Sequence, residues 1–149
     1  FEILLAATYK GVGERAVEVA AEHVAKRRSV KNQTTYSNDP DIRWRIAEAA
    51  LIMNAVGPQI RELARDIDEG VDRGRSWIPQ LSAAKNAAAE ATLRAVEQAM
   101  RACGGSAYYN THELSRLYRD ALAGLFQPSD QESLHAAWAN LILGPIEKA

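Results

Sequence analysis

Residues 40–71 read PDIRWRIAEAALIMNAVGPQIRELARDIDEGV, and this stretch decides the fold. Its apolar side chains recur at steps of four and three, at Ile42, Ile46, Ala49, Met53, Val56, Ile60, Leu63, Ile67 and Val71. That spacing places them on one face of an α-helix. Asp39 supplies an N-cap, with Pro40 at the first helical position. Gly57-Pro58 lies among these apolar positions, and their helical spacing continues in register on both sides. We therefore expect the helix to kink here rather than to end.

The same helical period extends on both sides of this segment. It predicts a first helix over about 2–28 and a third over about 77–103, which is rich in alanine and therefore the most enclosed. Shorter helices are predicted over about 112–126 and from a capping box at 129–132 to about residue 143. The alternation typical of β-strands never persists. The predicted fold class is all-α: an up-and-down antiparallel four-helix bundle with an extra C-terminal helix.

The bulk composition excludes several classes of function. The chain has 149 residues, 47% hydrophobic and 25% charged, with a formal net charge of −1. A charge this close to zero provides no field to recruit nucleic acid or an acidic membrane. No apolar run approaches the ~20 residues of a membrane span. The single cysteine, Cys103, excludes an intrachain disulfide and fits a reducing compartment, so we expect a cytoplasmic protein.

The start of the chain carries information of its own. Phe1 stands where an initiator methionine would, and the helical pattern begins almost at once without a capping residue. We expect that residues 1–149 form a single helical domain that is a fragment of a longer parent chain. A natural processing site at Phe1 is the alternative.

Several short segments follow one another in order along the chain. Residues 6–11 read Ala-Ala-x-Tyr-x-Gly, residues 26–28 read Lys-Arg-Arg, and residues 82–85 read Ser-Ala-Ala-Lys. The alanine-rich helix ends in Cys-Gly-Gly at 103–105, and residues 116–121 read Arg-Leu-Tyr-Arg-Asp-Ala. Each segment alone is weakly specific. Their order and spacing resemble the C-terminal domain of the acyl-CoA dehydrogenase family over essentially the whole chain.

This resemblance implies a bundle that packs against an N-terminal helical domain and a middle β-domain, with FAD between the β-domain and the bundle. It implies an FAD-dependent oxidoreductase whose C-terminal domain contributes to the flavin site and to a dimer interface. The parent chain is then an enzyme acting on an acyl-CoA or a similar small substrate, and it self-associates as a dimer or tetramer. We expect the isolated 149 residues to be inactive and to lack FAD. Two alternatives remain: a flavin-dependent hydroxylase or monooxygenase of the same fold, and a non-catalytic helical oligomerisation module.

Three residues are candidates for binding the cofactor. Arg28 matches the family arginine that reaches the FAD pyrophosphate, and a guanidinium can pair two phosphate oxygens in a fork. A solvated basic helix end is the alternative. Gly104 and Gly105 match the Gly-Gly turn near the cofactor, where the backbone can approach a ligand. A plain helix cap is the alternative for this pair.

No catalytic residue can be assigned from the sequence. In the resembled family a glutamate acts as the base, and a gapless comparison places Pro128 at its position, beside Gln127. Neither side chain can act as a base. The histidine of the hydroxylase branch would stand at about Gln127 and is also missing. Some relatives place the base on the first helix, where Glu2 is a weak candidate.

The remaining titratable side chains carry no predicted site. His23 and His112 are isolated in the sequence, and His135 lies in the fifth helix. Because the histidines lack the short spacing of a metal site, we predict no metal. Cys103 lies in an apolar stripe and is expected to pack rather than react.

Overall fold

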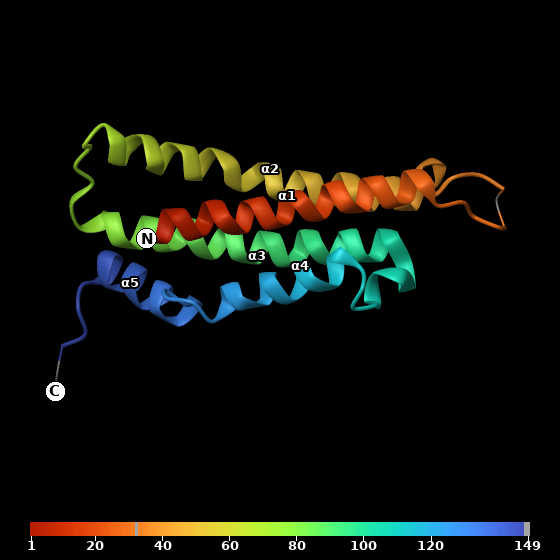
Figure 1. The fold of residues 1–149 in the computed structure, drawn as a ribbon. Helices are drawn as coiled ribbons and strands as arrows, with labels where there is room; N and C mark the ends of the chain where they lie inside the picture. The colour runs from red at the N-terminus through yellow and green to blue at the C-terminus, as the bar shows by residue number, and fades with distance from the viewer. Residues whose placement is uncertain (32, 148–149) are drawn as a thin grey trace.

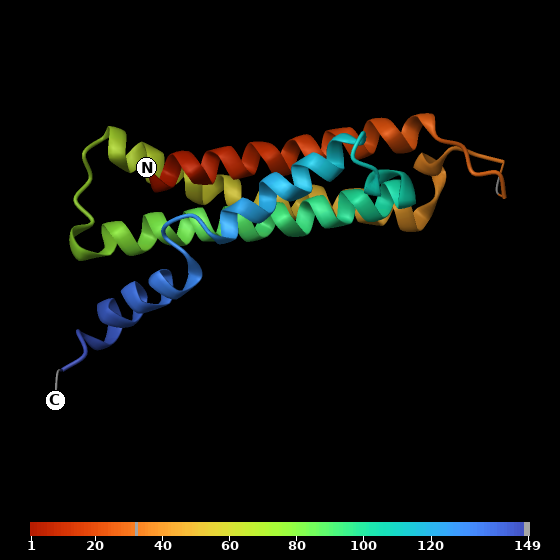
Figure 2. The same ribbon diagram turned by 60° about the horizontal axis from the view of Figure 1, so that its bottom comes forward.

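Four helices of the computed structural model run alternately up and down: α1 (Glu2–Lys26), α2 (Pro40–Asp68), α3 (Trp77–Cys103) and α4 (Glu113–Leu122) (Figure 1). A fifth, α5 (Gln131–Leu143), lies beside the end of the bundle where α3 begins, and diverges from it in the turned view (Figure 2). The structure describes residues 1–31 and 33–147, and within these ranges there is no β-strand. The predicted all-α bundle with an extra C-terminal helix is confirmed.

The helix boundaries follow the caps of the sequence with three exceptions. α2 continues through Pro58, and the Asp39 carboxylate caps it by accepting the backbone N–H groups of Asp41 and Ile42 at 2.9 and 3.2 Å. α1 ends at Lys26 because Arg27 is extended, with ψ at 134°. α4 ends at Leu122 and continues as a short 3₁₀ turn. The cap of α5 is Asp130 and not Ser129, since the Asp130 carboxylate accepts the Ser133 N–H.

α3 is the most enclosed helix, as its alanine content predicts, because α1, α2 and α4 all pack against it. Its buried positions are Pro79, Ser82, Ala84, Lys85, Asn86, Ala88, Ala89, Ala91, Thr92, Ala95, Val96, Ala99, Ala102 and Cys103. Most of these side chains are small, so the neighbouring helices can approach closely. α1 and α2 also approach closely, since a Cβ on Gly13 would lie 2.5 Å from the Met53 sulfur. No helix among the described residues is long and apolar enough to cross a bilayer.

Candidate functional site

The end of α1 carries Arg28, the predicted pyrophosphate-binding residue. The chain turns back on itself here, with the Ser29 N–H donating to Thr34 O at 2.8 Å and the Tyr36 N–H donating to Arg27 O at 2.9 Å. The Arg28 side chain is exposed, and its Nη2 donates to the Gln33 carbonyl at 2.8 Å. That bond engages one of the five N–H donors of the guanidinium.

The double-glycine turn follows α3. Gly104 has a φ of 71°, in the left-handed region that favours glycine, so its presence is explained by the end of the helix. Gly105 has no positive φ. No atom lies within 4 Å of the point where a Cβ would stand on either glycine. Neither conformation nor crowding therefore explains Gly105, and the backbone at this turn is open to approach.

Arg27 joins these two places at one end of the bundle. Its Nη1 donates to the Cys103 carbonyl at 2.9 Å and to Ser106 Oγ at 3.0 Å, and its guanidinium lies 4.9 Å from the Tyr36 ring centre. The residue next to Arg28 thus ties the end of α1 to both sides of the Gly104–Gly105 turn. This role could not be predicted from the sequence, because Arg27 looks like one more charge in a basic helix end.

A hollow of about 410 Å³ lies beside the same turn. Its lining residues are Met100, Tyr108, Tyr109, Asn110, Ser115, Tyr118 and Arg119. Arg119 Nη1 donates to Ser115 Oγ at 3.0 Å, one turn earlier on α4. Asp120 pairs with Arg116 at 3.0 Å rather than with its neighbour Arg119. Arg119 and Asp120 each make their contacts within α4.

The segment 127–129 is held in place by a buried lysine. The Lys85 side chain is fully buried, and its Nζ donates to the carbonyls of Gly124, Gln127 and Ser129 at 2.8, 2.7 and 3.1 Å. Burial lowers the pKa of Lys85, and the nearby carboxylates of Glu2 and Asp130 oppose that shift. These contacts fix the backbone between α4 and α5.

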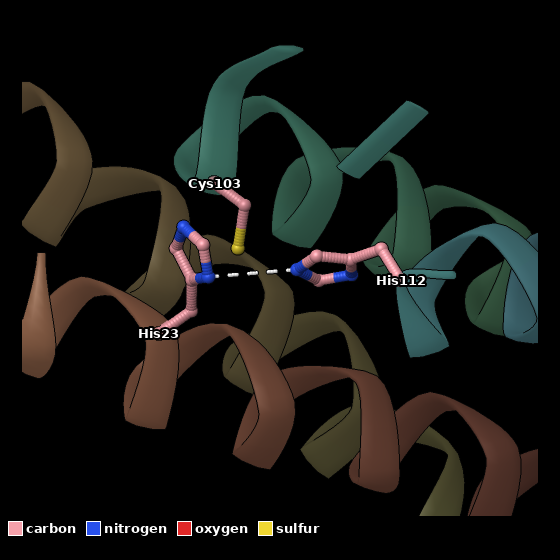
Figure 3. Close-up of side chains that lie close together, drawn as sticks. All are labelled: His23, Cys103 and His112. Atoms are coloured by element: carbon pink, nitrogen blue, oxygen red, sulfur yellow. Dashed lines mark hydrogen bonds between the residues drawn. The ribbon is translucent and has the colours of Figure 1, made fainter. Parts of the chain in front are cut away.

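His23, Cys103 and His112 meet near the ends of α1, α3 and the start of α4 (Figure 3). The two imidazole rings are 5.2 Å apart, and His112 Nε2 lies 3.5 Å from His23 Nδ1. The sequence predicts isolated histidines, and for this pair the prediction is wrong. The residues are 89 positions apart, and helical period alone does not say which helix faces which.

Burial sets the protonation of this cluster. It raises the pKa of the Cys103 thiol to about 11, against a smaller opposing effect of Arg27. It also lowers the pKa of His23, and the neighbouring His112 and Arg27 act in the same direction. At neutral pH the thiol therefore keeps its proton and His23 is neutral.

Comparison with known proteins places the chain in a family. The sequence pattern of the family "Acyl-CoA dehydrogenase, C-terminal domain" matches residues 3–126. The chain belongs to this family. It is 30% identical over 122 residues to YdbM of Bacillus subtilis (strain 168), which carries the name of an acyl-CoA dehydrogenase. That match covers 82% of this chain and 32% of YdbM, so the chain spans about a third of its relative.

Solved structures share the fold of this C-terminal domain. An acyl-CoA dehydrogenase from Geobacillus kaustophilus superimposes with a TM-score of 0.85 at 19% identity, covering 95% of this chain and 36% of the other. Butyryl-CoA dehydrogenase from Megasphaera elsdenii superimposes with a TM-score of 0.85 at 20% identity, covering 95% of this chain and 36% of the other. A nitroalkane oxidase from Podospora anserina superimposes with a TM-score of 0.86 at 18% identity, covering 99% of this chain and 35% of the other.

Within this acyl-CoA dehydrogenase domain, the segment expected to correspond to the family base carries no carboxylate at Gln127 or Pro128. Gln127 Oε1 accepts the Tyr9 hydroxyl at 2.9 Å. Glu2 comes to the same segment from α1, and its Oε1 accepts the Ser129 N–H at 3.0 Å. The other oxygen, Oε2, is enclosed without a hydrogen-bond partner among the described residues. Glu2 therefore holds the segment through its Oε1.

Proposed function

We propose that this chain is the C-terminal domain of a longer FAD-dependent oxidoreductase of the acyl-CoA dehydrogenase type, acting on an acyl-CoA in the cytoplasm. Family membership over residues 3–126 supports the reaction class. The contact of Arg27 with Cys103 and Ser106 carries the proposal, because it brings Arg28 and the Gly104–Gly105 turn to one end of the bundle. The two features predicted to bind the cofactor then lie at the same end of the bundle.

The residues at this end fit the pyrophosphate of FAD. Arg28 is exposed at the bend after α1 and can present a fork of N–H groups to two phosphate oxygens. The open backbone at Gly104 and Gly105 lets a ligand approach without a Cβ in the way. Bound FAD would supply the acceptor for the hydride removed from the acyl β-carbon. Arg28 and the glycine turn would bind and orient it, and a carboxylate elsewhere in the parent chain would remove the α-proton.

The exposed apolar surface supports assembly with other parts of the parent and with a second copy. Trp44 and Leu51 lie seven positions apart on α2, on one face of the helix, and are 60% and 64% exposed. α5 has no buried residue, and its Ile142 and Leu143 are 72% and 83% exposed. Neighbouring large apolar side chains that are exposed together support an interaction surface. We assign the α2 face to self-association as a dimer or tetramer, and α5 to packing within the parent chain.

The test uses the full parent chain, purified and examined for a bound yellow chromophore. Arg28→Ala should weaken FAD binding by roughly 10- to 100-fold, the value of a lost charge-assisted hydrogen bond. Lys26→Ala is the matched control, since it removes a neighbouring exposed charge outside the proposed site. Equal FAD affinity in Arg28→Ala and Lys26→Ala would contradict the role of Arg28.

The reaction is tested by adding acyl-CoA to the holoenzyme without oxygen. Bleaching of the flavin is the expected result. Oxygen consumption after external reduction, with no bleaching by acyl-CoA, would instead indicate a hydroxylase of the same fold. A parent that never holds flavin would be a helical oligomerisation module. The isolated 149 residues should not retain stoichiometric FAD, because the proposed site is shared with other domains of the parent chain. Tight retention of FAD by the isolated residues would contradict that proposal.

A further inference from the structure

The cluster of His23, Cys103 and His112 has the composition of a transition-metal site. One ligand atom from each side chain lies within 4.8 Å of the other two, and the three residues come from different parts of the chain (Figure 3). Imidazole nitrogen and thiolate sulfur are the ligands that zinc-class ions prefer. Zinc bonds of about 2.0–2.3 Å in a tetrahedron place ligand atoms roughly 3.3–3.6 Å apart. The 3.5 Å between His23 Nδ1 and His112 Nε2 already meets that spacing.

We propose that His23 Nδ1, Cys103 Sγ and His112 Nε2 bind one zinc-class divalent ion, with water as the fourth ligand. Cys103 is buried, whereas both histidines are partly exposed, so the open side of the cluster faces solvent and admits the ion and its water. The site would clamp the end of α1 to the end of α3 and the first residue before α4. Metal binding here does not require the proposed flavin function, although Cys103 adjoins the Gly104–Gly105 turn.

The surrounding hydrogen bonds already hold the His23 imidazole in the tautomer that metal binding requires. The Ser106 hydroxyl donates to the Cys103 carbonyl at 3.0 Å, which leaves its oxygen to accept the His23 Nε2–H at 3.3 Å. That bond places the proton of neutral His23 on Nε2, and Nδ1 is then free to bind a metal. A ligand histidine whose second N–H is held by a neighbour is the common arrangement in metal sites.

The second imidazole must change tautomer. Without metal, His112 Nδ1 accepts the Leu114 N–H at 3.2 Å, so the His112 proton sits on Nε2 and points to His23. On binding, that proton moves to Nδ1, Nε2 joins the metal, and the Leu114 bond is lost. The Cys103 thiol releases its proton to solvent at the same step. Metal binding should therefore loosen the first turn of α4.

Two charged side chains lie near the site and affect how favourably it binds a cation. The Arg27 guanidinium, bonded to Cys103 O and Ser106 Oγ, opposes a cation. The Glu113 carboxylate follows His112 and is paired with Arg15 at 3.0 Å. The Cys103 thiolate supplies the negative charge that offsets Arg27. A thiolate is therefore essential here, and a site with two imidazoles alone should bind weakly.

The test titrates the protein with Co²⁺ and then Zn²⁺ under reducing conditions. The expected result is one equivalent of Co²⁺ with a thiolate-to-cobalt absorption band, displaced by Zn²⁺. Zinc at about a hundredfold excess over its Kd should raise Tm by roughly 5–10 °C. Absence of the thiolate-to-cobalt band would overturn the proposal.

Three variants locate the site. His112→Asn removes the ligand but keeps an N-cap acceptor for Leu114, so the variant should fold, and its Kd for Zn²⁺ should rise about a hundredfold or more. Cys103→Ser should also lose the cobalt band. His135→Gln is the control, because His135 is exposed on α5 and should not affect binding. Unchanged affinity in His112→Asn, or lost affinity in His135→Gln, would contradict the site.

A readout independent of any variant is the amide of Leu114. Its hydrogen exchange should become faster when zinc binds to the wild-type protein, since the bond to His112 Nδ1 is given up. Slower or unchanged exchange at Leu114 in the zinc-bound protein would overturn the assigned His112 ligand atom.

Discussion

A buried ammonium destabilises a protein unless each of its donors finds an acceptor. Lys85 meets that condition with the carbonyls of Gly124, Gln127 and Ser129. Lys85→Met should lower the free energy of unfolding by about 2–4 kcal/mol, because Gly124 O and Gln127 O lose the Lys85 donor, while Ser129 O keeps the Asn86 side-chain N–H. Urea denaturation measures the change, with the exposed Lys26→Met as control, expected within about 0.5 kcal/mol of wild type. A Lys85→Met protein as stable as this control would refute the role assigned to Lys85.

Two glycines should respond to alanine with opposite signs. A Cβ on Gly124 would lie 2.8 Å from the Ala89 Cβ and 3.0 Å from Tyr9 Cζ, and neither neighbour is the end of a flexible chain. Gly124→Ala should destabilise the protein by about 1–3 kcal/mol. Gly11 has open space, and Gly11→Ala should stabilise α1 by about 0.5–1 kcal/mol. Thermal unfolding of both variants checks this, and a higher Tm for Gly124→Ala would disprove the packing argument.

At the scale of the helices, the cap of α2 can be tested alone. Asp39 accepts two backbone N–H groups at the start of α2, so Asp39→Ala should cost about 1 kcal/mol. Asp39→Asn should retain most of the stability, since asparagine caps as well as aspartate. Chemical denaturation compares the two. An equal loss in both variants would mean that the carboxylate acts through its charge and not as a cap.

The bounds of a helix could be predicted where residues within or next to that helix determine them. α2 and α3 carry a sustained period together with a cap or a stop of their own, and their observed bounds agree with that pattern. The ends that differ depend on partners distant in sequence. α1 stops short because Arg27 turns toward Cys103 and Ser106. Ser129 does not cap α5: Glu2 and Lys85 hold its backbone, and its Oγ is enclosed without a hydrogen-bond partner among the described residues.

The same distinction separates the two sites. Arg28 and the double glycine could be named because they belong to an ordered set of short segments that resembles a family. The cluster of His23, Cys103 and His112 could not be found this way, because no short spacing joins its members. The helical period of the sequence places each of these three residues on a helix or at the end of one. Only the packing of α1 against α3 and α4 brings them together.

For the whole molecule, Arg15 and Glu113 tie α1 to α4 and make stability depend on pH. The Arg15 guanidinium donates to both Glu113 oxygens at 3.1 and 3.0 Å, and these bonds lower the pKa of Glu113. A lowered carboxyl pKa contributes stability above the unfolded value, near 4.5, that is lost as the pH falls. Glu113→Gln should therefore lower Tm at pH 7, and the difference from wild type should shrink below about pH 4. A difference that is constant with pH would exclude this ion pair as its source.

The burial of α3 also limits how its sequence can diverge. Its exposed positions beyond the first turn are Ala87, Glu90, Arg94, Glu97 and Arg101, a single line at steps of three and four. Neutral drift over most of this helix is therefore confined to one row of side chains, and bulkier residues elsewhere would push a neighbouring helix away. Homologous chains should vary along that row and keep small side chains around the rest of the rod.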